Sequence, residues 1–181
     1  MAIVLQYLLR LAGQSLIVRE VRGREALSEP FRFEVLLHLE DGAVVVPSSA
    51  LRQDAVLELV REDVERTITG VITQISVGEV APDAKVAAPV LQATIEPMFA
   101  LARLKKNTKA FVAKSAVDIV TEVLGELGVA HAWRLESSYP VRPYTVQSGE
   151  TDFHFVSRML EEEGIFYFFD EGGTMILGDG T

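Results

Sequence analysis

The stretch from Tyr139 to Phe169 constrains the fold most, because strand, helix and strand signals follow one another in it without a spacer. At its start Tyr144 and Val146 alternate with polar residues, as in a strand that is buried on one face. Ser148-Gly149 is typical of a break in such a pattern. The sequence therefore predicts a strand over Arg142 to Gln147 that ends before the next element begins.

The middle of this stretch predicts a capped helix. Thr151 can serve as the N-cap, and Asp152 places a carboxylate at the positive end of the helix dipole. Gly164 stands where a helix-terminating glycine belongs. An apolar stripe at helical spacing is formed by Phe153, Val156 and Leu160 and widened by Phe155 and Met159. A short apolar strand, Ile165 to Phe169, follows at once, so the helix has little freedom of orientation.

The first hundred residues are typical of an antiparallel barrel or sandwich. Six runs rich in Val, Ile, Leu and Phe are separated by Gly, Pro, Asp and Ser: Ile3 to Leu11, Ser15 to Val21, Phe31 to Leu39, Ala55 to Val60, Arg66 to Val77 and Val86 to Phe99. Gly70 interrupts the fifth run and predicts a β-bulge. We assign residues 1–104 to the strands of this barrel.

At Lys105 the strand pattern gives way, and residues 105–181 predict a helix-containing α+β part. Ser115 and Asp118 have the spacing of a capping box, and Gly128 can end the helix that follows. Its apolar face consists of Ile119, Val120, Val123, Leu124 and Leu127. A hairpin across Glu171-Gly172-Gly173 closes this part with a strand at Thr174 to Leu177. The fold class is therefore mainly β (α+β), with two embedded helices.

Composition excludes several classes of protein. With 49% apolar residues in 181, the chain can bury a core, and no apolar run approaches the roughly 20 residues that span a bilayer. The opening residues predict a strand and not a signal peptide, so we expect a soluble protein without membrane anchoring. The absence of cysteine excludes disulfides and thiolate chemistry.

Net charge opposes nucleic-acid binding. The formal charge is -9, which repels phosphate backbones unless a basic patch overrides it. The best patch is formed by Arg103, Lys105, Lys106, Lys109 and Lys114. It lacks the interleaved aromatic residues of single-strand binders, so we interpret it as a solvated or subunit-facing surface.

Candidate chemical groups have structural interpretations as well. Glu161-Glu162-Glu163 lies in the last helical turn, where consecutive side chains point about 100° apart and oppose the helix dipole. Arg158 can pair with Glu161 or Glu162. The three histidines, His38, His131 and His154, are too scattered for a metal site, and the serines lie outside hydrolase and phosphate-loop motifs. The sequence predicts no catalytic, cofactor-binding or metal-ligating residues.

The aromatic strand after Gly164 predicts a contact surface. Successive strand residues face opposite sides, so half of Phe166 to Phe169 should join the core and half should meet a partner or a second layer. Together with the neighbouring charges they form a candidate assembly surface: Arg158, Glu161, Glu162, Glu163, Phe166 and Phe168. Charge pairing of the basic segment Lys105 to Lys114 with the acidic segment between subunits is a further hypothesis.

The same stretch resembles the N-terminal region of the Rhs/Vgr (VgrG) spike proteins of type VI secretion systems, which are similar to phage tail hub and late-control D proteins. The residues that carry the resemblance are Tyr139-Pro140-x-Arg142-x-Tyr144-x-Val146-Gln147, Glu150-x-Asp152-Phe153-x-Phe155-x-Ser157-Arg158 and Glu161-Glu162-Glu163-Gly164-Ile165-x-Tyr167-Phe168. Leu27-Ser28-x-Pro30-Phe31-x-Phe33-Glu34-Val35, Gly70-x-Ile72 and Phe111 with Lys114-Ser115 and Ile119 agree with it. At His154 the family usually carries an acidic residue.

This resemblance implies a structural hub of the phage tail hub type. Such a hub would form a homotrimer in a longer protein, dock on a hexameric tail tube, and carry a needle and effectors into target cells. Baseplate components and effectors would bind through other regions. The protein would be cytoplasmic in the assembled apparatus and then injected. We therefore expect that the protein is not an enzyme. The alternatives to a secretion spike hub are a phage or prophage contractile tail hub and, as a less favoured one, a tail-associated cell-wall hydrolase domain. We expect the chain to be a fragment of a longer spike protein.

Overall fold

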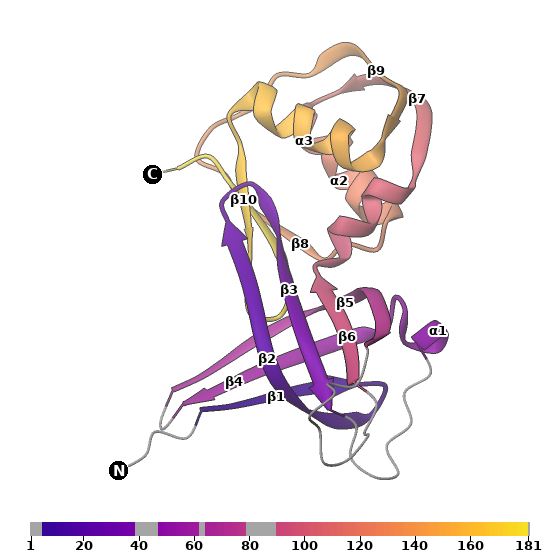
Figure 1. Ribbon diagram of the computed structural model, residues 1–181. Coiled ribbons are helices and arrows are strands. Elements are labelled where there is room, and N and C mark those ends of the chain that lie inside the picture. Colours follow the sequence, from indigo (N-terminus) through magenta and orange to yellow (C-terminus); the bar gives the residue numbers. More distant parts are fainter. Residues whose placement is uncertain (1–4, 39–46, 62–63, 79–89, 181) are drawn as a thin grey trace. The chain divides into compact units, whose positions relative to one another are not determined.

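A computed structural model describes residues 5–38, 47–61, 64–78 and 90–180, which divide into two compact units (Figure 1). The first unit contains Met1–Glu25 and Phe31–Pro97. The second contains Met98–Thr181 together with Ala26–Pro30. A short segment from the first half of the chain therefore belongs to the second unit.

The first unit is a closed antiparallel barrel, which confirms the predicted fold class and selects a barrel over a sandwich. Its strands run in the order β1-β2-β3-β6-β5-β4, and β4 pairs with β1 to close it. They are β1 (Leu5–Leu11), β2 (Gln14–Ala26), β3 (Glu29–His38), β4 (Asp54–Arg61), β5 (Val64–Gly78) and β6 (Val90–Glu96). A short helix, α1 (Pro47–Ala50), lies between β3 and β4 in the chain.

Alternation along the strands builds the barrel core. Leu9 of β1 pairs with Leu16 of β2 on one side and with Leu57 of β4 on the other, and all three side chains are buried. In β3, Val35 and Leu37 are buried while Leu36 between them is only partly buried. Because strand side chains alternate between faces, one buried row on each strand is enough to fill the interior.

β2 is longer than predicted, since its second half contains few apolar residues. The pattern predicted Ser15 to Val21, whereas the strand runs from Gln14 to Ala26 with exposed charged residues near its end. The turn that follows belongs to the second unit, where the Ser28 amide donates to the Tyr167 carbonyl at 2.8 Å. β3 is the other neighbour of β2 in the barrel, and pairing of this kind can hold a strand that its own residue pattern does not reveal.

The bulge predicted at Gly70 lies elsewhere. Gly70 pairs in regular register with Ala55, and the irregularity in β5 falls between Ile72 and Gln74. A Cβ atom at Gly70 would stand 2.5 Å from the carbonyl oxygen of Glu96 on β6. The glycine is therefore needed for the close approach of two backbones and not for a change of register.

The second unit packs two helices against two small sheets. Its elements are a 3-10 helix η1 (Met98–Leu104), β7 (Lys106–Lys114), α2 (Ala116–Glu126), β8 (His131–Arg134), β9 (Arg142–Thr151), α3 (Asp152–Glu163), β10 (Phe166–Phe169) and β11 (Met175–Gly178). β7 and β9 form an antiparallel ribbon, and the other sheet has the order β10-β11-β8. A shared core joins these elements through residues such as Phe111, Phe155, Tyr167 and Met175.

Two strands of this unit were not predicted. Lys105 appeared to end the strand pattern, yet β7 begins at Lys106, and β8 pairs in parallel with β11. β9 does not stop at Ser148-Gly149 but continues to Thr151. Gly149, at φ 65°, is the extra residue where Asn107 pairs with Glu150 and Thr108 with Ser148. The break predicted from Ser148-Gly149 is therefore a bulge inside the strand.

Both long helices begin and end where the sequence predicted. Ser115 caps α2 in a complete capping box: its Oγ accepts from the Asp118 amide at 3.1 Å, and the Asp118 carboxylate accepts from the Ser115 amide at 3.0 Å. Gly128 follows the helix with φ 69°.

Among the helices of the described residues, none combines the length and the apolar character needed to cross a bilayer.

We expect Asp118→Asn to destabilise the chain by about 1 kcal/mol near neutral pH, because it weakens the capping box. Hydrogen bonds from Ser115 hold the pKa of Asp118 below its usual range. Since the folded pKa is lowered, this stabilisation is present above the pKa of the unfolded carboxyl and is lost as pH falls through the folded value. Urea denaturation at several pH values should show the difference between the two proteins shrinking as pH falls below the ordinary pKa of an aspartate carboxyl. A difference that stays constant would contradict this role.

Candidate assembly surface

α3 positions four of the six residues in the candidate assembly surface. Its N-cap Thr151 accepts from the His154 amide at 3.2 Å, and Gly164 follows the helix in the left-handed conformation at φ 70°. The predicted cap is present although His154 occupies the position where a capping box carries an acid. These two ends determine where Arg158 and the acidic last turn lie.

A buried carboxylate ties the start of α3 to the ribbon. Asp152, only 1% exposed, accepts hydrogen bonds from Asn107 Nδ2 at 2.7 Å and from Gln147 Nε2 at 2.8 Å. The Nζ atom of Lys105 lies 3.8 Å from the same carboxylate. The sequence predicted only a helix-dipole role for Asp152. Its bonds to both strands hold α3 in register with β7 and β9.

Charges at the end of α3 are compensated within the chain. Arg158 Nη1 lies 3.0 Å from Glu162, and its Nη2 lies 2.7 Å from Glu150 of β9. Arg142 of β9 contacts both Glu162, at 2.6 Å, and Glu163. Of the two predicted partners of Arg158, the structure thus selects Glu162. Sequence reasoning missed Arg142, because it lies 20 residues before Glu162 and only tertiary structure joins them.

These contacts favour the charged forms of the groups that make them. Hydrogen bonds from Arg142 and then from Arg158 lower the pKa of Glu162, although burial opposes the shift. The hydrogen bond to Glu162 raises the pKa of Arg142, and the one to Glu150 raises that of Arg158. The two arginines therefore neutralise an acidic helix end that would otherwise oppose the dipole.

The remaining members of the candidate surface make none of these ion pairs. Glu161 is exposed, and within the described residues no ion pair joins it. Phe166 and Phe168 lie on β10, opposite Gly178 and Ile176 of β11. Phe168 is 37% exposed, whereas Tyr167 between them is buried in the core. The strand thus alternates as expected, with one large aromatic side chain directed outward.

Lysines of the basic segment have acidic partners in the same chain. Lys109 and Lys114 contact Glu126 and Glu122 of α2, and Lys105 lies 3.9 Å from Glu126. Pairing between this segment and the acidic end of α3 in another subunit stays a prediction.

The ribbon has an outer face that sequence reasoning missed, because β7 was not predicted. Directly opposed pairs on this face are Thr108 with Ser148, Ala110 with Val146 and Val112 with Tyr144. All six side chains are exposed and none is charged. We call these six residues the ribbon face. Behind it, polar Thr145 and Gln147 are buried, so β9 reverses the usual polarity of a half-buried strand.

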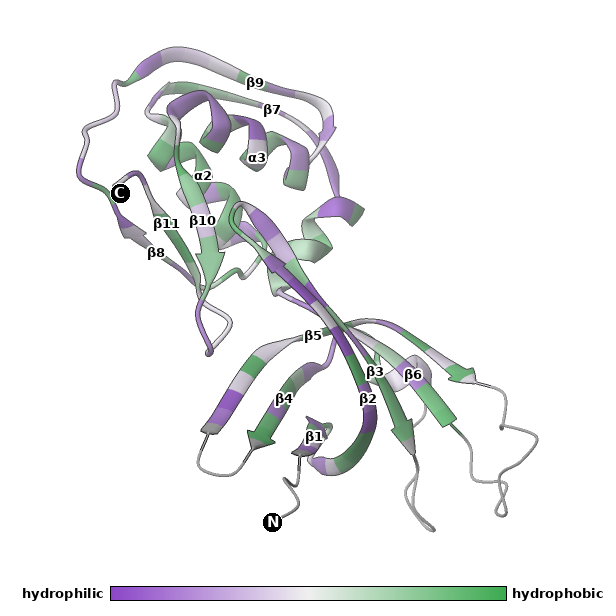
Figure 2. Ribbon diagram, turned by 60° about the vertical axis from the view of Figure 1, so that its left-hand side comes forward, coloured by the Kyte–Doolittle hydropathy of each residue, from purple (hydrophilic) through white to green (hydrophobic). Residues whose placement is uncertain are grey.

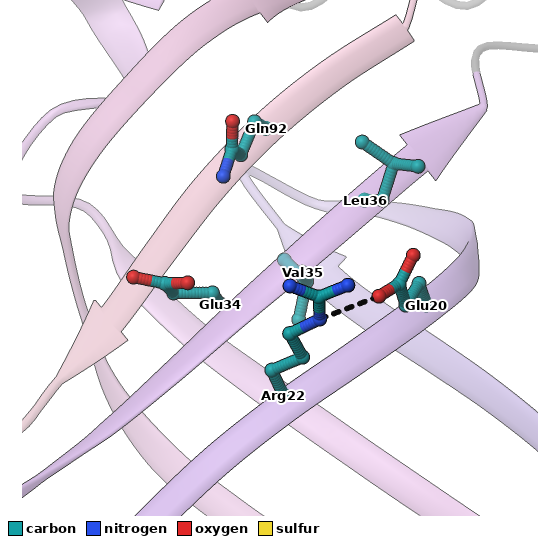
Figure 3. A pocket seen from close by; sticks show the side chains of 6 residues that line it. All are labelled: Glu20, Arg22, Glu34, Val35, Leu36 and Gln92. Atoms are coloured by element: carbon teal, nitrogen blue, oxygen red, sulfur yellow. Dashed lines mark hydrogen bonds and ion pairs between the residues drawn. The ribbon is translucent and has the colours of Figure 1, made fainter.

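The barrel carries a polar groove with a volume of about 170 Å³ (Figure 3). It is lined by Glu20, Arg22, Glu34, Val35, Leu36 and Gln92. Arg22 Nε lies 2.6 Å from Glu20, and Arg32 Nη2 lies 3.0 Å from Glu34, so each lining carboxylate has an arginine partner. Paired carboxylates of this kind are typical of a structural surface and offer no uncompensated acid or base.

The histidines occupy three different elements: His38 lies in β3, His131 in β8 and His154 in α3. His131 Nδ1 is 2.9 Å from the Val129 carbonyl oxygen. Throughout residues 5–38, 47–61, 64–78 and 90–180, no three His, Asp or Glu side chains gather as they would around a metal ion.

Comparison with known proteins gives a family match over most of the chain. The family model of the phage tail baseplate hub (GPD) matches residues 24–181. The type VI secretion system spike protein VgrG5 of Pseudomonas aeruginosa is 35% identical over 169 residues, which cover 87% of this chain and 20% of that protein. The chain thus spans about a fifth of the length of this curated relative.

Solved structures agree with the family match. The E. coli c3393 protein, described as a component of the type VI secretion system with structural similarity to the T4 bacteriophage tail proteins gp27 and gp5, superposes with a TM-score of 0.78 at 29% identity. The match covers 94% of this chain and 48% of that one. The 43 kDa tail protein of prophage MuSo2 from Shewanella oneidensis shares the fold, with a TM-score of 0.66 at 15% identity over 96% of this chain and 53% of its own.

Proposed function

Because the chain belongs to the phage tail baseplate hub (GPD) family, we propose that it is the hub-forming part of a type VI secretion spike. The observation that carries the proposal is the combination of a closed six-stranded barrel with an α+β unit in a chain 35% identical to a spike protein. Its role is mechanical: three copies form a hub, dock on a hexameric tail tube and transmit the force of contraction. The hub is assembled in the cytoplasm, carries needle and effectors, and is injected with them.

The closed barrel supports this role. A barrel leaves no open strand edge, so it can contact neighbours through its outer faces without drawing in further strands. Hydrophobic side chains such as Leu9, Leu57 and Ile72 are fully buried in its interior, which suits a part that must resist deformation.

The test is assembly of the intact gene product with the tail tube protein of the same genome. Mass photometry should show a trimer, and electron cryomicroscopy should show it at the end of the tube. A product that stays monomeric, or that does not bind the tube, would contradict the proposal.

A charge reversal within the candidate assembly surface tests whether this surface contacts another subunit. Glu161 is a better position for it than Glu162. Glu162→Lys would place a third cation beside Arg142 and Arg158, so it would weaken the fold as well as any subunit contact. Glu161→Lys reverses an exposed charge without disturbing those pairs. We expect Glu161→Lys to weaken trimer formation by about tenfold in sedimentation equilibrium of the intact product. Glu171→Lys, in the turn before β11, is the matched control, and equal behaviour of the two variants would remove Glu161 from the surface.

A phage tail hub is the second candidate, favoured by the fold shared with the MuSo2 tail protein. The two functions use the same hub and differ in the particle around it. Neighbouring genes distinguish them: sheath and tube genes of the secretion type support the spike, whereas capsid genes support the phage tail.

A further inference from the structure

The ribbon of β7 and β9 is a two-stranded sheet with one face covered and one exposed. Its inner face packs on the helices through Phe111, Thr145 and Gln147. Figure 2 shows the two strands running side by side along one side of α3. On the ribbon face, Val112 is 63% exposed and Tyr144 is 61% exposed. An exposed pair of a β-branched and an aromatic side chain leaves apolar surface that a further strand beside the ribbon can contact.

Each strand of the ribbon has a single strand neighbour within the described residues, so each has an edge open to pairing. The two edges differ in their surroundings. Along β9, Arg158 of α3 donates to the Val146 carbonyl at 3.3 Å and contacts Glu150, so a helix side chain already uses a main-chain acceptor of that strand. The lysines of β7 contact α2 through their own side chains, whereas Arg158 uses a main-chain acceptor of β9, so β7 is the strand better suited to accept another chain.

Charge selects what β7 can accept. Four lysines, Lys105, Lys106, Lys109 and Lys114, lie on this strand or just before it. Lys105, Lys109 and Lys114 form ion pairs with three acids, Glu122, Glu126 and Asp152. Four lysines therefore face three acidic partners, and the strand keeps an excess of positive charge. Lysines on an edge strand repel the same edge of a second copy and attract an acidic strand.

Size points to the same kind of occupant. The large apolar side chains of the ribbon face are Val112, Tyr144 and Val146. Three side chains fall well short of the roughly 800 Å² per partner that a stable interface between folded proteins buries. They suit an extended segment, which gains most of its affinity from main-chain hydrogen bonds and adds alternate side-chain contacts.

We propose that β7 accepts an extended acidic segment of a partner protein as a third strand of the ribbon. Alternate apolar side chains of that segment lie beside Val112 on the ribbon face, and an acidic residue lies near Lys106. This binding mode uses the 181-residue chain alone, so its test does not depend on hub assembly.

The probe is a fluorescein-labelled peptide with alternating Val and Thr and a Glu at each end, and its counterpart carries Lys at both ends. Fluorescence anisotropy should show the Glu peptide binding at least about tenfold more tightly than the Lys peptide. Lys106→Glu should reverse that preference. Amide chemical-shift changes caused by the Glu peptide should concentrate in residues 106–114.

Two controls separate strand addition from other binding. Val112→Asp should weaken binding by about tenfold, whereas Val77→Asp on β5, at the same 63% exposure, should leave it unchanged. Methylation of alternate peptide amides on the pairing edge should abolish binding. The proposal is overturned if neither peptide binds at about 1 mM, if Val112→Asp binds as the parent does, or if the methylated peptide binds equally well.

Discussion

Replacing Gly70 with alanine is expected to lower the free energy of unfolding of the barrel by about 3 kcal/mol, the upper part of the range for overpacked sites. The new Cβ would stand 2.5 Å from the Glu96 carbonyl oxygen and 3.1 Å from Ile95 Cγ2. Gly70 pairs with Ala55 on β4, and its neighbour Val71 pairs with Glu96 on β6, so β5 cannot move away from one strand without straining the other. Urea denaturation followed by far-ultraviolet circular dichroism measures the loss.

Gly78→Ala is the matched control, because Gly78 lies on the same strand. Its new Cβ would meet the Val90 carbonyl oxygen at 3.4 Å, an ordinary van der Waals contact. We expect this variant to unfold within about 0.5 kcal/mol of the parent. Equal stability of the two variants would show that β6 yields easily at Glu96 and that close approach does not explain the glycine.

Phe155→Ala should lower the free energy of unfolding of the second unit by about 3–5 kcal/mol, since it leaves a cavity in a packed core. The Phe155 side chain is fully buried, and its ring stacks on Phe111 with centroids 5.5 Å apart and planes 12° from parallel. This contact joins α3 to β7, so its loss also loosens the ribbon. The single tryptophan, Trp133, lies on β8 in the same unit, and its fluorescence during urea denaturation reports this loss.

Phe168→Ala removes the same side chain from an outward position on β10. Less apolar area leaves the core, so the expected loss is about 1 kcal/mol or less. If Phe155→Ala unfolds at the same urea concentration as Phe168→Ala, the core of the second unit does not depend on the Phe111–Phe155 stack.

Elements with a local signal were predictable from the sequence. The N-caps Ser115 and Thr151 and the terminating Gly164 are short-range features, and each helix begins and ends as they indicate. The six strands of the barrel also follow from alternation and breakers, except that β2 continues beyond Val21 and that Met98 and Phe99, at the end of the sixth predicted run, lie in η1. β7 and β8 did not, because their apolar residues are few and neighbouring strands supply the order that their own residue pattern lacks.

The candidate assembly surface divides in the same way. Arg158 and Glu162 are four residues apart on a helix, so helix geometry predicts that they can pair, as it does for Glu161, and the structure selects Glu162. Arg142 reaches the same cluster from β9, and no local pattern reveals that contact. The ribbon face was hidden for a related reason: whether Tyr144 or Thr145 faces the helices depends on what packs against β9.

By itself, the sequence determined the helix ends, the barrel strands and the family resemblance, because hydrogen-bonding caps, glycine conformations and residue alternation act within a few residues of one another. Only the tertiary structure decided which strands pair, that Asp152 is buried between two of them, and that Val112 and Tyr144 face outward while Gln147 faces inward. The physical reason is that burial and partner choice depend on segments distant in the chain, and their free energy exists only when those segments are in contact.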